Sequence, residues 1–421
     1  MEFIADFHIH SRYSRATSRE MQVENLAETA SKKGITLLGT GDFTHPLYLA
    51  ELKAKLKPAG NGLYSLNKGG DETRFILTSE VSNIFSFRGK TRRIHTLIFA
   101  PSLEVVEKIN GRLSKWGRLE ADGRPIFGTP VKELVKLVLD SSPDCFLVPA
   151  HAWTPWFSLF GSNSGFDSIE ECFQEEAKNI KTIETGLSSD PEMNWRLSAL
   201  DKIILVSNSD AHSPNKLGRE ANVFQGQLDY YEIISAMQRP TANKPTRLLY
   251  TIEFFPEEGK YHYDGHRNCQ VVLPPTQSLK LDNICPNCSQ KLTIGVMHRV
   301  EELADRPAGF VPPGAIPTKH LVPLAEIIAA ALGCGTETAA VKKEYDRLIS
   351  IAGTEFNILL RMEEKDLARF TPPKILNGIL NVRQGKVEVS PGYDGVYGKV
   401  SITTEKASPG KGEKAQQMSL F

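Results

Sequence analysis

Metal-binding side chains follow short apolar segments throughout the first half of this 421-residue chain. Each segment reads as a strand, and each places a histidine or a carboxylate at or just past its end. These residues are His8, His10, Asp42, Glu80, His95, His151, Glu184, Asp210 and His212. Imidazole and carboxylate groups bind zinc, manganese and iron, so their repetition at successive strand ends predicts one shared multinuclear metal centre.

Short strand-like runs alternate with helical patterns over residues 1–250, as expected for β-α units around a mostly parallel sheet. The candidate strands are residues 3–9, 35–40, 75–81, 94–99, 145–149, 181–184 and 203–207. Apolar residues in 23–33 and 131–139 recur at three- and four-residue spacing, which predicts helices that cover the sheet. Seven strands favour a closed α/β barrel, where loops after the carboxyl ends of strands converge at one face. His95 is the exception, because it lies one residue inside its strand.

Composition limits the classes of function. Hydrophobic content of 40%, charged content of 24% and a formal net charge of zero describe an ordinary globular protein. A nucleic-acid partner must therefore be recognised through a local patch or motif. The length predicts two or three domains. No apolar stretch approaches the roughly 20 residues that span a bilayer, and no basic, apolar leader precedes the first motif, so we expect a cytoplasmic location and no membrane partner.

The six cysteines are unevenly spaced, which argues for a reducing compartment rather than a disulfide framework. Cys285 and Cys288 form a Cys-x-x-Cys pair, and His266 and Cys269 precede it. Two such pairs predict a closed structural zinc site of the zinc-ribbon type over residues 251–306, with His262 as the alternative to His266. A redox-active pair is the competing interpretation, but no thioredoxin-like β-α pattern surrounds it.

The residue pattern changes after the zinc motif. Residues 307–323 are rich in proline and glycine and predict a linker. Helices are predicted over 324–332, 338–351 and 363–370, and strands over 385–389 and 398–402. These elements predict a mostly helical C-terminal domain over 307–400. Residues 401–421 are polar and predict a flexible tail with a short apolar end.

Four separated motifs resemble, in order, those of the PHP family of phosphoesterases. They are His8-Ile-His10, Glu80, Pro149-Ala-His151 and Asp210-Ala-His212. The resemblance covers about 250 residues and implies a distorted (β/α)7 barrel with a trinuclear site. It implies that His8, His10, Glu80 and Asp210 hold one metal, that Glu80 bridges to a second held by His95 and His151, and that His212 holds the third. Zinc, manganese and magnesium are the candidate ions.

One motif departs from the family pattern. The family's second motif usually ends in Thr-Asp-His, whereas this chain reads Thr40-Gly-Asp42-Phe43-Thr-His45. Phe43 therefore stands where a histidine is expected. Either Asp42 or the displaced His45 completes the third metal site in this interpretation, and Glu184 is either a ligand or a residue that supports one.

The succession of barrel, zinc module and helical domain resembles the endonuclease Q family. The sequence His262-Tyr-Asp-Gly-His266-Arg-Asn-Cys269 and the later Thr293 to Arg306 segment carry this resemblance. It implies a DNA repair endonuclease that cuts on the 5′ side of uracil, hypoxanthine, xanthine and abasic sites. In that reading Glu80, His151 and Asp210 belong to the catalytic centre, where metals activate water, clamp the phosphate and stabilise the departing 3′ oxygen.

The last five residues resemble the peptide with which bacterial DNA-processing proteins bind the sliding clamp. They are Gln417, Met418, Ser419, Leu420 and Phe421. The resemblance implies a polar contact from Gln417 and an apolar pocket for Met418, Leu420 and Phe421. A sliding clamp is therefore a second expected partner beside damaged DNA.

A nuclease that reads a damaged base must extrude it from the duplex. Aromatic residues concentrated after His151 are candidates to stack on that base, with an ordinary core role as the alternative; they are Trp153, Trp156, Phe157 and Phe160. A local basic patch is the candidate for backbone phosphates, with a solvated surface run as the alternative; it consists of Arg88, Lys90, Arg92 and Arg93.

Two other functions share the same metal site. One is a phosphatase of the same family that acts on a small phosphomonoester such as histidinol phosphate. It leaves the zinc module, the helical domain and the clamp-like tail unexplained. The other is a clamp-tethered DNA-binding scaffold with a vestigial barrel. The near-complete set of metal ligands argues against it.

Overall fold

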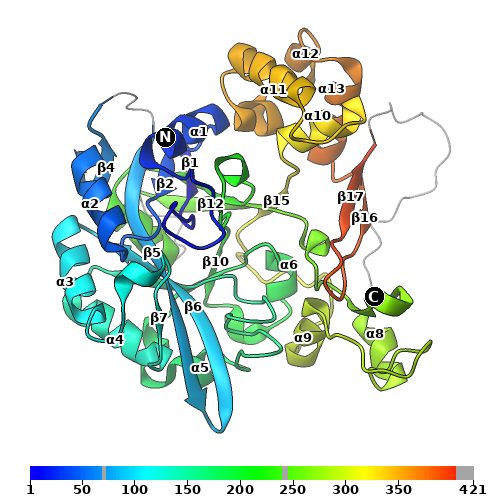
Figure 1. Cartoon of the computed structure of the whole chain (residues 1–421). Coiled ribbons are helices and arrows are strands. Elements are labelled where there is room, and N and C mark those ends of the chain that lie inside the picture. Colours follow the sequence, from blue (N-terminus) through cyan, green and yellow to red (C-terminus); the bar gives the residue numbers. More distant parts are fainter. Residues whose placement is uncertain (69–72, 239–244, 404–421) are drawn as a thin grey trace.

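The central strands of the protein are the seven that the sequence predicts. The computed structural model describes residues 1–68, 73–238 and 245–403, so the clamp-like peptide of Gln417 to Phe421 lies outside the described residues. The seven strands are β1 (Glu2–Asp6), β2 (Leu37–Gly39), β5 (Arg74–Phe87), β6 (Lys90–Ala100), β8 (Phe146–Pro149), β9 (Thr182–Glu184) and β10 (Ile204–Val206). Together with the helices around them they form a mixed α/β structure (Figure 1).

The pairing of these strands is less parallel than the sequence predicts. β1 pairs with β2, β2 with β5, and β9 with β10 in parallel. β5 and β6 are antiparallel, as are β6 and β8. The reversal follows from the turn at Arg88 and Gly89, whose φ values of 47° and 77° suit a two-residue hairpin. The hairpin projects beyond the rest of the sheet at the bottom of Figure 1.

Single contacts bring the remaining strand ends together. The Ala152 N–H donates to the Glu184 carbonyl at 2.9 Å, just beyond β8 and β9. Ile9 and Ala211 form an isolated parallel bridge beyond β1 and β10. The segments that follow the carboxyl ends of the parallel strands therefore meet at one edge, and this edge carries the metal-type side chains.

Outer strands widen the sheet on both sides. β11 (Ala221–Gln225) pairs antiparallel with β1, and β12 (Arg247–Glu253) pairs antiparallel with β11. β15 (Thr318–His320) then pairs parallel with β12, so part of the predicted linker 307–323 is a strand of the main sheet. The other outer strands are β3 (Leu56–Gly60), β4 (Leu63–Leu66) and the short β7 (Ile126–Phe127).

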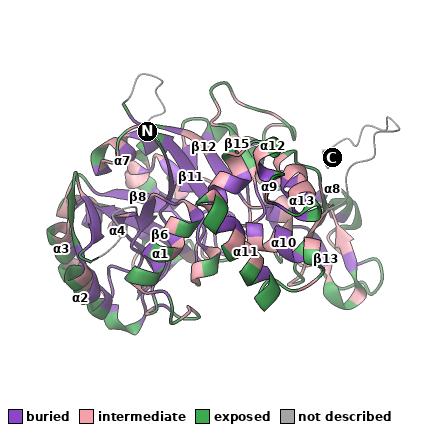
Figure 2. Ribbon diagram, turned by 90° about the horizontal axis from the view of Figure 1, so that it is seen from above, coloured by how far each residue is buried: buried purple, intermediate pink, exposed green. Residues whose placement is uncertain are grey.

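Helices cover this sheet with their apolar faces. The predicted helices at 23–33 and 131–139 are α1 (Val23–Lys33) and α4 (Val131–Ser141). α1 buries Val23, Leu26 and Ala30 and ends at Gly34, whose φ of 88° stops the helix. Figure 2 shows the strands buried and the outer helix faces exposed. The other helices of this region are α2 (Pro46–Lys55), α3 (Leu103–Leu113), α5 (Ile169–Phe173), α6 (Pro191–Asn194) and α7 (Tyr230–Gln238).

The C-terminal region contains the predicted helices and one more. α10 (Leu324–Leu332), α11 (Ala339–Ala352) and α12 (Glu364–Leu367) correspond to the predicted segments, and α13 (Pro373–Arg383) was not predicted. These helices gather in one group at the upper right of Figure 1, above the hairpin of β16 (Val387–Ser390) and β17 (Lys399–Ile402). Among the described residues, no helix combines the length and apolarity that crossing a bilayer requires. The domain boundaries stay predictions.

Candidate metal centre

The first cluster of ligand atoms comes from His8, His10 and Asp210. His8 Nε2 lies 3.6 Å and His10 Nε2 lies 3.1 Å from Asp210 Oδ1. All three atoms are buried, and none has a hydrogen-bond partner among the described residues. Buried polar atoms are otherwise paired, so three orphaned ligand atoms that converge on one point fit a metal ion.

The second cluster comes from Glu80, His95 and His151. Glu80 Oε1 lies 2.8 Å from His95 Nδ1 and 3.1 Å from His151 Nε2. Its other oxygen, Oε2, lies 3.3 Å from His10 Nε2 of the first cluster. One buried carboxylate therefore reaches both clusters, as the sequence predicts for a bridging ligand.

Two further carboxylates hold the histidines in position from behind. His8 Nδ1 donates to both oxygens of Glu184, at 3.1 and 3.0 Å, which leaves Nε2 free for a metal. His10 Nδ1 donates in the same way to Asp42 Oδ1 at 3.0 Å. A carboxylate on the outer ring nitrogen fixes the tautomer and raises the basicity of a metal-binding histidine. Glu184 and Asp42, which the sequence offers as ligands, thus lie one layer further out.

The backbone at this edge is strained in a consistent way. Asp42, His151 and Asp210 have φ values of 46°, 31° and 46°, a left-handed conformation that L side chains rarely adopt. All three stand at or next to the turns after strands. Gly186 allows the neighbouring loop to reach His151, because a Cβ there would lie 2.5 Å from His151 Cβ. Strain of this kind persists where the surroundings over-determine it and is common at functional sites.

Burial and neighbouring charges shift the pKa values of these side chains in different directions. Burial lowers the pKa of His95 to about 4, against the attraction of Glu80, so this imidazole is neutral at neutral pH. Burial alone would raise the pKa of Glu80, but the charges of His95, Arg124 and His8 hold it well below its usual range. Burial also opposes protonation of His8, but the carboxylates around it raise its pKa. A metal ion would have to displace the His8 proton.

The predicted third metal site has no matching cluster among the described residues. Phe43 is fully buried in the core and supplies no ligand. His45 stacks on Tyr13 with ring centroids 4.6 Å apart, and its Nδ1 has no hydrogen-bond partner within the described part of the chain. The ring of His212 is tilted against that of His10, with centroids 4.6 Å apart, and its side chain is one-third exposed. Asp42, His45 and His212 therefore form no group of three close ligand atoms among the described residues.

Arg124 is a site residue that the sequence analysis missed. Its Nη1 donates to Glu80 Oε2 at 2.9 Å, and its side chain is 27% exposed. The segment before it packs closely, since a Cβ on Gly123 would lie 2.4 Å from Asp42 Oδ2. Arg124 lies in the loop before β7 and does not follow the carboxyl end of a strand, so the strand-end signal could not reveal it.

Two of the four aromatic candidates belong to the core. Trp153 is 1% exposed, packs on Phe160 with ring centroids 4.7 Å apart, and donates from Nε1 to Asn194 Oδ1 at 2.8 Å. Phe160 is equally buried. Neither ring is accessible to a base, so the prediction that Trp153 contacts substrate is wrong, and the alternative of a core role holds.

The other two aromatic residues face the outside of the site. Phe157 packs on His95 with ring centroids 4.7 Å apart, and the guanidinium of Arg93 lies 5.6 Å from the same ring. Trp156 is 40% exposed and meets Tyr261 edge to face at 5.6 Å. Phe157 thus contacts β6 at both His95 and Arg93, and Trp156 connects the same loop to the zinc module.

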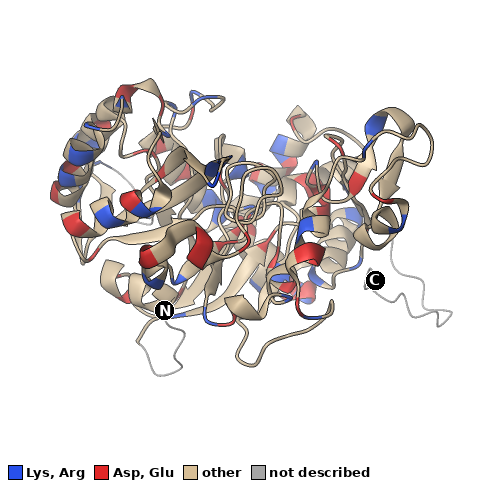
Figure 3. Cartoon of the chain, turned by 90° about the horizontal axis from the view of Figure 1, so that it is seen from below, with Lys and Arg blue, Asp and Glu red and all other residues tan. Residues whose placement is uncertain are grey.

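The predicted basic patch is divided by the fold. Arg92 donates to the Gly165 carbonyl and lies 4.3 Å above the ring of Phe166, so its guanidinium is committed to the protein itself. Arg88 is at the hairpin turn, exposed, and pairs with Glu171 at 3.4 Å. Figure 3 shows both signs of charge interspersed over the chain seen from below. Arg88 and Lys90 are exposed and Arg93 is partly exposed, so these three members remain accessible.

The four predicted zinc ligands lie together. The ligand atoms of His266, Cys269, Cys285 and Cys288 are all within 4.8 Å of one another. His266 ends β13 (Asp264–His266), which pairs antiparallel with β14 (Val271–Leu273). Burial raises the pKa of the Cys285 thiol, but the N–H groups of Asn287 and Cys288 outweigh it and bring the pKa to about 6. His262 is buried elsewhere and is not part of the cluster, so it is not the fourth ligand.

Comparison with known proteins gives matches over both the whole chain and its parts. A model of the MJ0043 C-terminal domain family matches residues 323–386. Uncharacterized protein YqxK of Bacillus subtilis is 31% identical over 413 residues, which cover 94% of this chain and 98% of YqxK. Uncharacterized protein MJ0043 of Methanocaldococcus jannaschii is 34% identical over 61% of this chain; the chain spans only 32% of that relative's length.

Solved structures match the full length. The crystal structure of the lesion-specific endonuclease PfuEndoQ from Pyrococcus furiosus has 32% identity and a TM-score of 0.84 over 96% of each chain. The chain belongs to the endonuclease Q family. A second endonuclease Q structure, a complex with a 27-mer duplex substrate with an abasic lesion at the active site, has 32% identity and a TM-score of 0.83. It covers 96% of this chain and 97% of that one.

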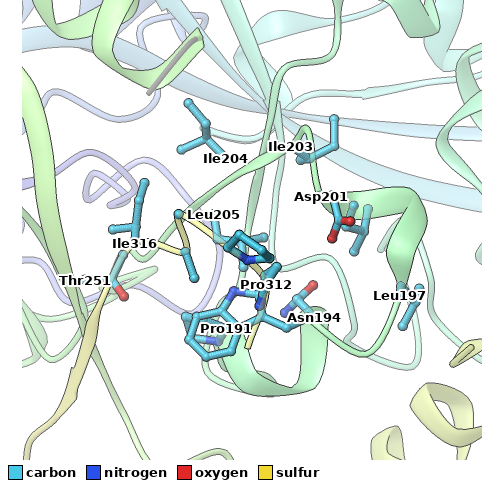
Figure 4. Close-up of a pocket in the computed structure, with 15 residues that line it drawn as sticks. Pro191, Asn194, Leu197, Asp201, Ile203, Ile204, Leu205, Thr251, Pro312 and Ile316 are labelled. Carbon is cyan, nitrogen blue, oxygen red and sulfur yellow. The ribbon is translucent and has the colours of Figure 1, made fainter. Parts of the chain in front are cut away.

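In this endonuclease Q family member, a cavity of about 120 Å³ lies outside the two clusters of the metal centre. Pro191 and Asn194 of α6, Ile204 of β10, and Pro312 and Ile316 of the segment before β15 are among the residues around it (Figure 4). None of the residues that line it belongs to either cluster of the metal centre. Within the metal centre, the side chains of Asp210 and His212 are 26% and 33% exposed, so solvent reaches the centre on this side.

Proposed function

We propose that this chain is a metal-dependent DNA endonuclease that nicks a strand on the 5′ side of deaminated bases and abasic sites. The observation that carries the proposal is the full-length match to endonuclease Q structures, one of them with an abasic duplex at the active site. The ligand clusters at the carboxyl edge of the strands add the chemistry that phosphodiester hydrolysis requires.

Two metal ions are the occupants that the clusters support best. His8, His10 and Asp210 would hold one, and His95 and His151 the other, with Glu80 shared between them. Bound divalent metals supply an activated water at neutral pH and neutralise charge on the phosphate. Glu184 and Asp42 keep the two N-terminal imidazoles oriented. We interpret the seven strands as a distorted (β/α)7 barrel whose mouth is the partly exposed Asp210 side.

Arg124 supplies a positive charge for the scissile phosphate in this proposal. One guanidinium nitrogen binds Glu80, and for the others no acceptor is found among the described residues. We expect Arg124→Ala to lower kcat on a lesion duplex by roughly 100-fold, the usual cost of one preorganised donor to a reacting group. Arg124→Lys keeps the charge but lacks the planar guanidinium with its paired donors, so its kcat should lie between those of Arg124→Ala and the parent. Single-turnover cleavage measures both variants, and an unchanged rate in Arg124→Ala would remove the residue from the site.

Trp156 and Phe157 are the proposed contacts to an extruded or flanking base, and the two tryptophans of this loop form a matched pair. Trp156→Ala should weaken binding of an abasic duplex by roughly 10-fold at unchanged thermal stability, because one base–aromatic stack is lost. Trp153→Ala should instead destabilise the protein by about 3–5 kcal/mol, as loss of a buried ring does. Fluorescence anisotropy and thermal melting measure the two effects. Equal stability losses in both variants would contradict this division of roles.

The substrate class is tested directly with three kinds of duplex and one small phosphomonoester. Labelled duplexes would carry a single uracil, a single hypoxanthine or an abasic site, and an undamaged duplex is the control. The proposal expects nicking of the damaged strand only. Phosphate release from histidinol phosphate with no nicking would select the phosphatase alternative, and binding without either reaction would select the scaffold.

The zinc-ribbon module and the terminal peptide give this enzyme further contacts. We propose that His266, Cys269, Cys285 and Cys288 bind one structural zinc, and that the module contacts DNA beside Trp156, since Tyr261 meets that ring. The resemblance of Gln417 to Phe421 to clamp-binding peptides supports docking to a sliding clamp. Removing residues 417–421 should abolish co-elution with the clamp and leave nicking of a short duplex unchanged.

A further inference from the structure

A third group of metal-type ligands lies outside the proposed active site and the zinc module. It consists of Asp190, Glu192 and His320, and their ligand atoms are within 4.8 Å of one another. His320 Nε2 lies 3.3 Å from Asp190 Oδ2. The residues come from two distant parts of the chain, since Asp190 and Glu192 stand at the start of α6 and His320 ends β15.

The geometry of Asp190 leaves one oxygen for a ligand. Asp190 caps α6 and accepts the Met193 N–H on Oδ1 at 2.9 Å. Its other oxygen, Oδ2, is the one that faces His320. The His320 ring is held against Phe255, with centroids 5.3 Å apart, so its orientation is set by packing as well as by the carboxylate.

A buried and unpartnered carboxylate points to a ligand at the same place. Glu253 of β12 is the register partner of His320 in a parallel pair, so both side chains project from the same face of the sheet. Glu253 is 0% exposed; Thr185 Oγ1 donates to its Oε2 at 3.1 Å, and its Oε1 has no hydrogen-bond partner among the described residues. Glu257 Oε2 is a second buried oxygen for which the described part of the chain offers no hydrogen-bond partner.

Several carboxylates surround the single imidazole of this group. Four carboxylates, those of Asp190, Glu192, Glu253 and Glu257, influence one another or His320. Among the described residues none of them forms an ion pair with lysine or arginine. His320 is the basic group that pairs with one of them, at 3.3 Å from Asp190, and a bound divalent cation would offset further carboxylate charge at this place.

We propose that Asp190, Glu192 and His320 bind a divalent transition-metal ion, zinc or manganese, with the Glu253 carboxylate beside it as a fourth ligand or hydrogen-bond support. One imidazole with several carboxylates is a ligand set that suits these ions. The ion joins α6, which follows β9 of the central sheet, to β15 and the end of β12. It is therefore structural, and it holds the segment after the zinc module against the region that carries the active site.

Counting metal ions in the full-length protein tests this site. The chain would be equilibrated with excess zinc or manganese, freed of unbound ion by gel filtration, and analysed by inductively coupled plasma mass spectrometry. His320→Gln and Asp190→Asn should each hold one equivalent less than the parent; asparagine still caps the helix. Glu258→Gln is the matched control, since this carboxylate lies in the same segment outside the group, and should hold as much metal as the parent. An unchanged count in both ligand variants would overturn the proposal.

A second measurement covers the case in which a variant fails to fold. Crystals of the unmodified chain, soaked with zinc or manganese, should show an anomalous difference peak about 2.0–2.2 Å from His320 Nε2 and Asp190 Oδ2. Data at the absorption edge of each metal identify the ion. A crystal with peaks at the active-site clusters and none between Asp190 and His320 would contradict the site, and would leave the proposed endonuclease function untouched.

Discussion

Asp210→Ala is expected to lower the rate of lesion cleavage by at least about 1,000-fold while duplex binding remains measurable. Asp210 Oδ1 faces both His8 Nε2 and His10 Nε2, and it supplies the only carboxylate of the first cluster. Its loss removes a ligand and a charge that offsets a bound divalent ion, an effect worth several kcal/mol on the reaction barrier. The DNA contacts proposed for Trp156, Phe157 and Arg93 are untouched.

The measurement is single-turnover cleavage of an abasic duplex in zinc- or manganese-containing buffer, with binding followed by anisotropy. Asp346→Ala is the control, because Asp346 is an exposed aspartate of α11 far along the chain from the clusters. Metal analysis should show that Asp210→Ala has lost metal from the barrel centre. Cleavage at the parent rate with metal present would exclude Asp210 from the centre.

Cys285→Ser is expected to remove one zinc per chain and to unfold the zinc module while the N-terminal α/β region stays folded. The module's own apolar core is small, with Val271, Cys285 and Leu292 as its buried members. A core of this size cannot hold a fold, and structural zinc in small modules contributes about 10–16 kcal/mol of binding free energy that becomes folding free energy. The variant should bind lesion duplex more weakly, since Tyr261 would no longer be held against Trp156.

Zinc content and limited proteolysis measure this prediction. Cleavage sites should appear within residues 261–295 in Cys285→Ser. Cys334→Ser is the matched control, because this partly buried cysteine contacts Thr338 and stands outside the cluster. A Cys285→Ser protein with full zinc content and a protease-resistant module would show that this thiol is no ligand.

The strand-end histidines and carboxylates could be predicted because a strand period and a ligand type coincide in a short stretch of sequence. His8, His10 and His151 needed no knowledge of the tertiary structure beyond the rule that carboxyl ends of strands share an edge. Glu80 is a correction, because β5 continues to Phe87 and this carboxylate lies in mid-strand. Which residues would bind the metal directly and which would support the ligands was harder to predict. Asp42 and Glu184 look like ligands in sequence, and only the hydrogen bonds to His10 and His8 place them one layer out.

Other features depend on contacts that leave no local signal. The antiparallel centre of the sheet follows from the two-residue turn at Arg88 and Gly89, which is hard to separate from a longer loop. Trp153 and Trp156 are three residues apart and read alike, yet one is buried and the other exposed. Asp190 and His320 form their pair only after β15 joins the sheet. Burial and long-range pairing are properties of the packed chain, and these are the points where sequence reasoning failed or stopped.

We propose that the two ligand clusters, His8 with His10 and Asp210 and Glu80 with His95 and His151, cut DNA next to a damaged nucleotide. The most direct measurement maps the nick at single-nucleotide resolution on a duplex with one uracil or one abasic site, labelled on each strand in turn. The account predicts a metal-dependent nick immediately 5′ of the lesion, in the damaged strand alone, and none in the matched undamaged duplex. Equal cutting of damaged and undamaged duplexes, or no cutting by a metal-loaded protein, would contradict it.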